Sequence, residues 1–306
     1  MADNVTSGSL TLVGIGPGGL DYLTRRAERA ICDADVVVGY RLYLELIIPL
    51  IEDKQYLEFP MGAEFERAQE SVRRALDGER VALVTGGAST AGIGFASACV
   101  LAAEGAAIVL TDVSDEVSKR AADFPAGTRV EAFNQDVCSE AEWIATFERA
   151  RSIFGGVDIL VNNAGIPDAQ RATKMSDEFI DTVFSTNLVG PWKLSCEVAR
   201  RLMAAKQPGR IVNLSSTGAF RYDGNGAALY STTKAAVVRM TETMAVEWSR
   251  FHINVNAIAP GAFESEMMDG MLERLGDISQ HFPRKRIGNP AQLDSTLLYC
   301  LSPASE

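Results

Sequence analysis

The chain reads RVALVTGGASTAGIG from residue 80 to residue 94. An apolar run at 81–84 passes directly into a glycine-rich loop, and an alanine-rich stretch follows, which predicts the order strand, loop, helix. Glycines directly after a strand let the backbone approach a pyrophosphate, whose charge then meets the N-terminal end of the next helix. Gly86, Gly92 and Gly94 have that placement, so the loop predicts a dinucleotide site.

An acidic residue follows at the spacing that a dinucleotide site requires. Asp112 comes eighteen residues after Gly94, at the end of the next apolar run. A carboxylate there can accept hydrogen bonds from an adenosine ribose. It would also repel a 2′-phosphate, and the glycine loop contains no Arg or Lys. We therefore expect NAD to be preferred over NADP.

Strand-like and helical stretches alternate along the chain after the glycine loop at 85–94. Apolar runs suited to strands occupy 107–111, 130–134, 159–162, 210–214 and 254–258, and helical patterns separate them. This alternation predicts an α/β fold with a doubly wound, Rossmann-like parallel sheet and helices on both faces.

A second group of residues suggests chemistry. Tyr230 and Lys234 are four residues apart, so on a helix they share one face, and Ser216 precedes the tyrosine by fourteen residues. A tyrosine that acts as a base near neutral pH must lose roughly three units from its usual pKa, about 4 kcal/mol of differential stabilisation. A nearby ammonium and a bound nicotinamide cation could supply it.

In combination these features resemble the short-chain dehydrogenase/reductase family over residues 80–306. The motifs that carry the resemblance are Thr85-Gly86 through Gly92-Ile93-Gly94, Asp136-Val137, Asn162-Asn163-Ala164-Gly165, Asn187, Ser216 with Tyr230 and Lys234, and Pro260-Gly261 with Ser265. The implied cofactor-binding residues are Gly86, Ser89, Gly92, Ile93, Gly94, Asp112, Asp136, Val137, Asn163, Ala164, Gly165, Tyr230, Lys234, Pro260, Gly261 and Ser265. The implied catalytic residues are Asn187, Ser216, Tyr230 and Lys234.

The resemblance implies reversible hydride transfer between a secondary alcohol or ketone and C4 of the nicotinamide. Tyr230 would be the general acid/base, and Ser216 would hold the substrate oxygen. Lys234 would lower the pKa of the tyrosine and bind the nicotinamide ribose, and Asn187 would organise a water that relays the proton. The residues expected to line the substrate pocket are Phe220, Tyr222, Asp223, Phe263, Met267 and Met268.

One departure from the family concerns the C-terminus. The family usually continues past a sequence like Leu-Ser-Pro-Ala-Ser-Glu into one more edge strand, whereas this sequence ends at Glu306. The missing strand would leave an open sheet edge, weaken a dimer or tetramer and reduce activity.

The N-terminal part has a different character. Gly14, Gly16 and Gly19 satisfy GxGxxG formally, but no acidic residue follows the strand at 36–38 to bind a ribose. Instead, residues 10–84 resemble the start of the tetrapyrrole methylases, closest to the precorrin-3B C17-methyltransferases of cobalamin biosynthesis. The carrying stretches are Val13-Gly14-Ile15-Gly16-Pro17-Gly18-Gly19, Ala34-Asp35-Val36-Val37-Val38-Gly39-Tyr40 and Phe59-Pro60-Met61-Gly62. We expect two domains, an incomplete methylase-like segment over 1–79 and a dehydrogenase domain over 80–306.

This junction leaves alternatives open. The apolar strand at 80–84 suits either family, so the chain reads as a fusion joined at a shared sequence. An S-adenosylmethionine-dependent methyltransferase activity is one alternative, although most of the methyl-donor site is absent from the sequence. An inactive chimera or a non-enzymatic scaffold is another.

Composition and charge exclude several classes of protein. The formal net charge of −11 argues against nucleic-acid binding, and no apolar stretch approaches the roughly 20 residues of a membrane span. Five dispersed cysteines and two histidines provide neither a disulfide framework nor a metal site. The N-terminus carries no secretory signal. We expect a cytoplasmic enzyme that acts on a small alcohol or ketone, with no metal.

Overall fold

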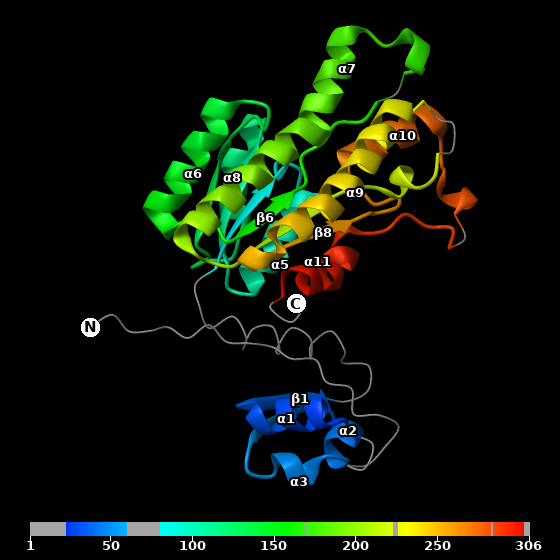
Figure 1. Ribbon diagram of the computed structural model, residues 1–306. Coiled ribbons are helices and arrows are strands. Elements are labelled where there is room, and N and C mark those ends of the chain that lie inside the picture. The colour runs from blue at the N-terminus through cyan, green and yellow to red at the C-terminus, as the bar shows by residue number, and fades with distance from the viewer. Residues whose placement is uncertain (1–22, 60–79, 169, 223–225, 283, 303–306) are drawn as a thin grey trace. The chain divides into compact units, whose positions relative to one another are not determined.

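The computed structural model describes residues 23–59, 80–168, 170–222, 226–282 and 284–302 (Figure 1). The chain divides into two compact units, one of residues 1–78 with 302–306 and one of residues 79–301. Each unit has its own hydrophobic cluster.

Within residues 23–59, the described part of the N-terminal unit, there are two parallel strands and three short helices. In chain order these are α1 (Arg25–Asp33), β1 (Val36–Tyr40), α2 (Arg41–Glu45), α3 (Ile48–Ile51) and β2 (Gln55–Phe59). Its buried core consists of Ile31, Leu44, Ile47 and Ile51. Pro49 lies in the first turn of α3, where a missing amide hydrogen costs nothing, so the apolar run at 42–51 forms two short helices. The sequence of this part also predicts a strand at 10–13, a loop at 14–19 and a helix at 64–76, all of which lie outside the described residues.

The second unit is built on a six-stranded sheet in which every pairing is parallel. The strands are β3 (Val81–Thr85), β4 (Ala107–Asp112), β5 (Val130–Asn134), β6 (Ile159–Asn162), β7 (Gly209–Leu214) and β8 (Ile253–Ile258). Their spatial order is β5-β4-β3-β6-β7-β8, so β5 and β8 are the edge strands. The predicted doubly wound parallel sheet is confirmed.

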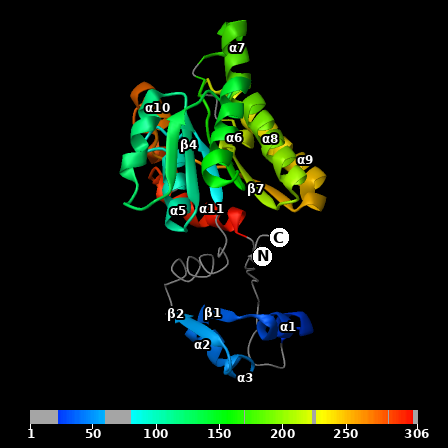
Figure 2. The ribbon, with the colours of Figure 1, turned by 90° about the vertical axis from the view of Figure 1, so that its left-hand side faces the viewer.

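Helices cover both faces of this sheet. The helices of this unit are α5 (Ile93–Ala103), α6 (Glu140–Phe154), α7 (Asp177–Phe184), α8 (Gly190–Ala205), α9 (Ala228–Trp248), α10 (Glu266–Leu275) and α11 (Asp294–Leu301). Side chains of α6, α8 and α9 belong to one buried cluster, and side chains of α5 and α11 belong to the other. The two groups of helices lie on opposite sides of the sheet (Figure 2). All five residues of β3 are buried, as a strand covered on both faces requires.

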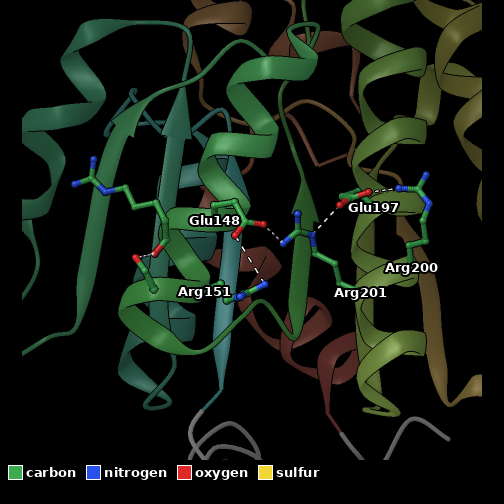
Figure 3. A network of polar contacts seen from close by, with 7 residues as sticks. Glu148, Arg151, Glu197, Arg200 and Arg201 are labelled. Carbon is green, nitrogen blue, oxygen red and sulfur yellow. Dashed lines mark hydrogen bonds and ion pairs between the residues drawn. The ribbon is translucent and has the colours of Figure 1, made fainter.

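Ion pairs link two helices of the first face at the surface. Arg201 of α8 contacts Glu148 of α6 at 2.9 Å and Glu197 of its own helix at 2.8 Å (Figure 3). Arg200 also pairs with Glu197, and Arg151 lies 3.9 Å from Glu148. This network lies outside the predicted site.

The strand order places the predicted site at one edge of the sheet. Parallel strands end at the same edge, and ligands of such sheets bind where the strand order reverses. Here β4 follows β3 on one side and β6 lies on the other. The loops after β3 and β6 therefore flank the point of reversal.

Candidate active site

The glycine loop after β3 is clamped to the loop after β6. The Asn163 amide donates to the carbonyl oxygens of Thr85 and Gly86, at 3.1 and 2.9 Å. In return, the Thr85 hydroxyl accepts from the backbone amides of Asn163 and Ala164, both at 3.1 Å. The two loops thus form one hydrogen-bonded structure at the reversal point.

Two of the glycines are required by close approach. Gly86 has φ +70°, and a Cβ there would lie 2.8 Å from the Asn163 amide nitrogen. A Cβ on Gly94 would lie 2.2 Å from the Gly86 carbonyl oxygen. Neither position has space for a side chain. Gly92 immediately precedes α5, and its amide donates to the Ser89 carbonyl at 3.0 Å, which closes the turn.

Asp112 lies at the end of β4, beside this loop. One carboxylate oxygen accepts from the Ala88 amide at 3.0 Å, and the other accepts from the Ser114 amide at 2.9 Å. Each carboxylate oxygen can accept a further hydrogen bond. The side chain thus orders the glycine loop and keeps acceptor capacity for a ligand.

The other residues expected at the cofactor site occupy neighbouring loops. Asp136 and Val137 follow β5, where the Asp136 carboxylate accepts from the Cys138 amide at 2.8 Å and Val137 is buried. Ile93 begins α5. A Cβ on Gly165 would lie 3.4 Å from both Asn187 Oδ1 and Lys234 Nζ, so this glycine sits between the cofactor loops and the reaction group.

The loop after β8 also contributes. The Pro260 carbonyl accepts from the Thr217 amide at 2.9 Å, which joins this loop to the loop after β7. Gly261 has open space around it. Ser265 precedes α10 and caps it by accepting from the Met268 amide at 3.2 Å. Of the residues expected to line the substrate pocket, Phe220 and Tyr222 are exposed, and Asp223 lies outside the described residues.

Ser216, Tyr230 and Lys234 come together at the start of α9. The Ser216 hydroxyl faces the Tyr230 phenol and acts to lower its pKa. Lys234 Nζ lies 5.7 Å from the centre of the tyrosine ring and donates to the Leu214 carbonyl at 2.7 Å. The Lys234 backbone carbonyl accepts from the Ser215 hydroxyl at 2.8 Å. The end of β7 therefore fixes both the tyrosine and the lysine.

Burial sets the ionisation of this group. It lowers the pKa of Lys234 from 10.5 to about 8. Burial also raises the pKa of Tyr230 above its usual value, the Ser216 hydroxyl opposes this, and the charge of Asp168 raises it further. We expected Lys234 to lower the pKa of Tyr230. In the chain without a cofactor the pKa is raised instead, because desolvation of the phenol is the largest effect.

Asn187 is fully buried in a π-helical turn (Ser185–Val189) between α7 and α8. Its side-chain oxygen accepts from the Ile166 amide at 2.8 Å, and its nitrogen donates to the Ile166 carbonyl at 2.9 Å. The nitrogen also donates to the Thr233 hydroxyl at 3.3 Å. The side chain thus ties this turn to the loop after β6 and to α9.

Sequence reasoning missed one charged residue in this group. Asp168 is 3% exposed and accepts from the amides of Leu229 and Tyr230, at 2.9 and 3.3 Å. The only available signal was an acidic residue close behind Asn162-Asn163-Ala164-Gly165, and its partners lie about sixty residues further along the chain.

Among the described residues, no cluster of three or more metal-binding side chains occurs. None of the helices in the described ranges has the length and apolar character of a membrane span.

Comparison with known families divides the sequence in two. Residues 86–306 match the sequence model of the enoyl-(acyl carrier protein) reductases. Residues 9–114 match that of the tetrapyrrole (corrin/porphyrin) methylases, which confirms the predicted methylase resemblance. The two matches overlap at 86–114, so the methylase likeness extends beyond the strand at which we placed its end.

Individual relatives support the assignment of the larger part. The short-chain reductase protein NovJ of Streptomyces niveus is 36% identical over 242 residues, covering 76% of this chain and 90% of the relative. The 3-oxoacyl-[acyl-carrier-protein] reductase FabG of Aquifex aeolicus is 35% identical, covering 73% and 90%. A crystal structure of gluconate 5-dehydrogenase from Burkholderia cenocepacia, in complex with NADP and tartrate, superposes with a TM-score of 0.66 at 30% identity, covering 74% and 89%. The chain therefore belongs to the short-chain dehydrogenase/reductase family.

Proposed function

We propose that this chain is a nicotinamide-dependent oxidoreductase that interconverts a secondary alcohol and a ketone, with Tyr230 as the general acid/base. The observation that carries the proposal is the meeting of Ser216, Tyr230 and Lys234 beside the clamped glycine loop. A phenol, a hydroxyl and a buried ammonium are the groups that proton transfer to a carbonyl oxygen requires.

Each side chain has a distinct part in this reaction. Ser216 would donate to the substrate oxygen, and Tyr230 would give or take its proton. The Lys234 ammonium would favour the phenolate when the tyrosine loses its proton. The Asn187 side chain already hydrogen-bonds Ile166, so its part is to hold the π-helical turn. A carbonyl oxygen only accepts, so the relay would be a water that donates to the backbone carbonyls of that turn and passes the proton on.

The residues present fit a nicotinamide dinucleotide. The first amides of α5 have no partner within the helix, and Gly92 provides no side-chain cap, so these donors can receive a phosphate. The glycine loop can pack this closely against Asn163 and the start of α5 only because Gly86 and Gly94 lack side chains. When bound, the cofactor supplies or accepts the hydride at C4 of its nicotinamide.

We further propose that NAD is preferred over NADP. The relative from Burkholderia cenocepacia contains NADP. In this chain, the Asp112 carboxylate at the end of β4 is the group that would repel a 2′-phosphate. A calorimetric titration with NADH and with NADPH measures the preference, and tighter binding of NADPH would contradict it.

Substitution of Tyr230 tests the reaction itself. Tyr230→Phe removes only the hydroxyl, so we expect NADH binding to be retained and turnover to fall by at least about a hundredfold. Turnover is measured first with gluconate and with a 3-oxoacyl thioester, the compounds that the names of two relatives suggest. Tyr299→Phe, at a tyrosine that is 60% exposed on α11, is the matched control. Undiminished turnover in Tyr230→Phe would refute the proposal.

The match of residues 9–114 to methylases favours a second candidate, binding of S-adenosylmethionine. The same calorimetric titration with S-adenosylmethionine examines it. Binding of this ligand alone, without NADH or NADPH, would make the methylase activity the better assignment.

A further inference from the structure

The first turn of α9 is capped by a residue from a distant loop. Ala227, the residue before this helix, has no side chain that can accept from the helix amides. Asp168, in the loop after β6, takes that place by accepting from the amides of Leu229 and Tyr230. Since the amide of Tyr230 itself is held, the cap fixes the tyrosine relative to Asn163 and Gly165 in the same loop.

The charge of Asp168 exceeds what capping requires. An uncharged Asn or Ser caps a helix equally well. Asp168 is buried, and its Oδ1 has no hydrogen-bond partner among the described residues. Burial raises the pKa of this carboxyl, and the amides of Tyr230, Leu229 and Asp168 and the charge of Arg274 oppose this. A buried, incompletely paired carboxylate is costly, so its place beside the tyrosine calls for a functional explanation.

We propose that Asp168 is a positioning residue for Tyr230, which acts through two hydrogen bonds to the first turn of α9 and through its negative charge near the phenol. The proposal rests on the proposed function, in which Tyr230 exchanges the proton. A negative charge near a phenol disfavours its ionised form. The protonated phenol is the form that gives a proton to a ketone oxygen, so Asp168 extends the pH range of ketone reduction upward.

The charged and titratable groups around this pair come from four elements. Ser216 faces the phenol from the loop after β7, and Lys234 lies one turn further along α9. Asp168 approaches from the loop after β6, and Arg274 acts on Asp168 from α10. The positive charge of Arg274 partly offsets the negative charge of Asp168, so substitution of Arg274 provides a second test.

Three substitutions separate the two actions of Asp168. Asp168→Asn keeps a side-chain oxygen for the helix amides and removes the charge. Asp168→Ala removes both. Asp158→Asn is the matched control, because Asp158 is a carboxylate at the other end of β6 that accepts from the Val81 amide at 3.0 Å and whose pKa burial also raises.

The ionisation of Tyr230 is measured by ultraviolet absorbance of tyrosinate during a pH titration of the full chain, with the matching Tyr230→Phe variant subtracted. We expect Asp168→Asn to move this ionisation to lower pH and Asp158→Asn to leave it in place. Turnover at the pH optimum should change little in Asp168→Asn and fall about ten- to a hundredfold in Asp168→Ala, because the tyrosine is displaced. A purely structural cap would leave the tyrosinate titration of Asp168→Asn unchanged, and that result overturns the proposal.

Arg274→Gln keeps the test decisive if the Asp168 variants do not fold. Arg274 is exposed on α10, and its loss leaves the Asp168 charge less compensated, so the tyrosinate titration should move to higher pH. A shift to lower pH would overturn the proposal. The proposed function fails separately, if Tyr230→Phe retains turnover. If Tyr230→Phe is inactive and the tyrosinate titration of Asp168→Asn is unchanged, only the role of Asp168 is rejected.

Discussion

The glycine loop after β3 and the tyrosine cluster (Ser216, Tyr230 and Lys234) lie at the same edge of one sheet, yet they are built from different interactions. The loop is held by backbone hydrogen bonds and by contacts too close for a side chain at Gly86 and Gly94. The cluster contains buried ionisable groups, among them Lys234, whose pKa burial lowers to about 8. The loop should therefore be sensitive to added atoms, and the cluster should be sensitive to pH.

The strongest test of this difference concerns Lys234. Its pKa is about 8 in the folded chain and 10.5 in an unfolded one, so between these values the unfolded state binds more protons. Below pH 8 both states carry the charge, and the folded state bears the cost of burying it. The free energy of unfolding should therefore rise by about 3 kcal/mol as the pH increases from 8 to 10.5.

Lys234→Met isolates this contribution. Methionine fills a similar volume and does not titrate, so the difference in stability between the wild-type chain and the variant should depend on pH only in that window. Denaturant unfolding at several pH values measures it. A difference that stays constant from pH 7 to pH 10.5 would show that Lys234 is not desolvated and would remove the contrast with the loop.

Gly94→Ala examines the loop. The new Cβ would lie 2.2 Å from the Gly86 carbonyl oxygen, so the loop or α5 must shift, at a cost of about 1 to 3 kcal/mol in stability. NADH binding should weaken in parallel. Gly270→Ala on α10 is the control, because its Cβ has open space and alanine favours a helix by about 0.5 to 1 kcal/mol. Unchanged NADH affinity in Gly94→Ala would separate the loop from the cofactor.

Asp112→Asn tests the one acidic side chain that orders the loop. We expect NADH affinity to fall about tenfold, because a charged acceptor of a ribose hydroxyl is lost, and the preference over NADPH to narrow. Calorimetry with both cofactors measures the change. Asp115→Asn removes the same charge from an exposed position three residues away, so equal effects in the two variants would indicate general charge repulsion.

The same division explains what could be predicted from the sequence. The strands of the six-stranded sheet, the glycine loop after β3 and the shared helical face of Tyr230 and Lys234 depend on short-range spacing, and the structure reproduces them. Asp168 could not be found because its partners, the amides of Leu229 and Tyr230, are determined by tertiary packing. The direction of the shift in the Tyr230 pKa also depends on burial, which cannot be read from the spacing of residues in the sequence.

Substitutions in the surface ion pairs should change the free energy of unfolding least. The Glu197 side chain is 14% exposed and pairs with Arg200 and Arg201, so Glu197→Gln should lower the free energy of unfolding by no more than about 1 kcal/mol. Glu148 is 52% exposed, and Glu148→Gln should cost less still, because water screens its pairing with Arg201 (Figure 3). Turnover should be unchanged in both variants. If the effect of a charge on stability grows with its burial, the size of the change in the free energy of unfolding should fall in the order Lys234, Glu197, Glu148. A change at Glu148 as large as that at Lys234 would mean that burial does not set the energetic effect of charge in this chain.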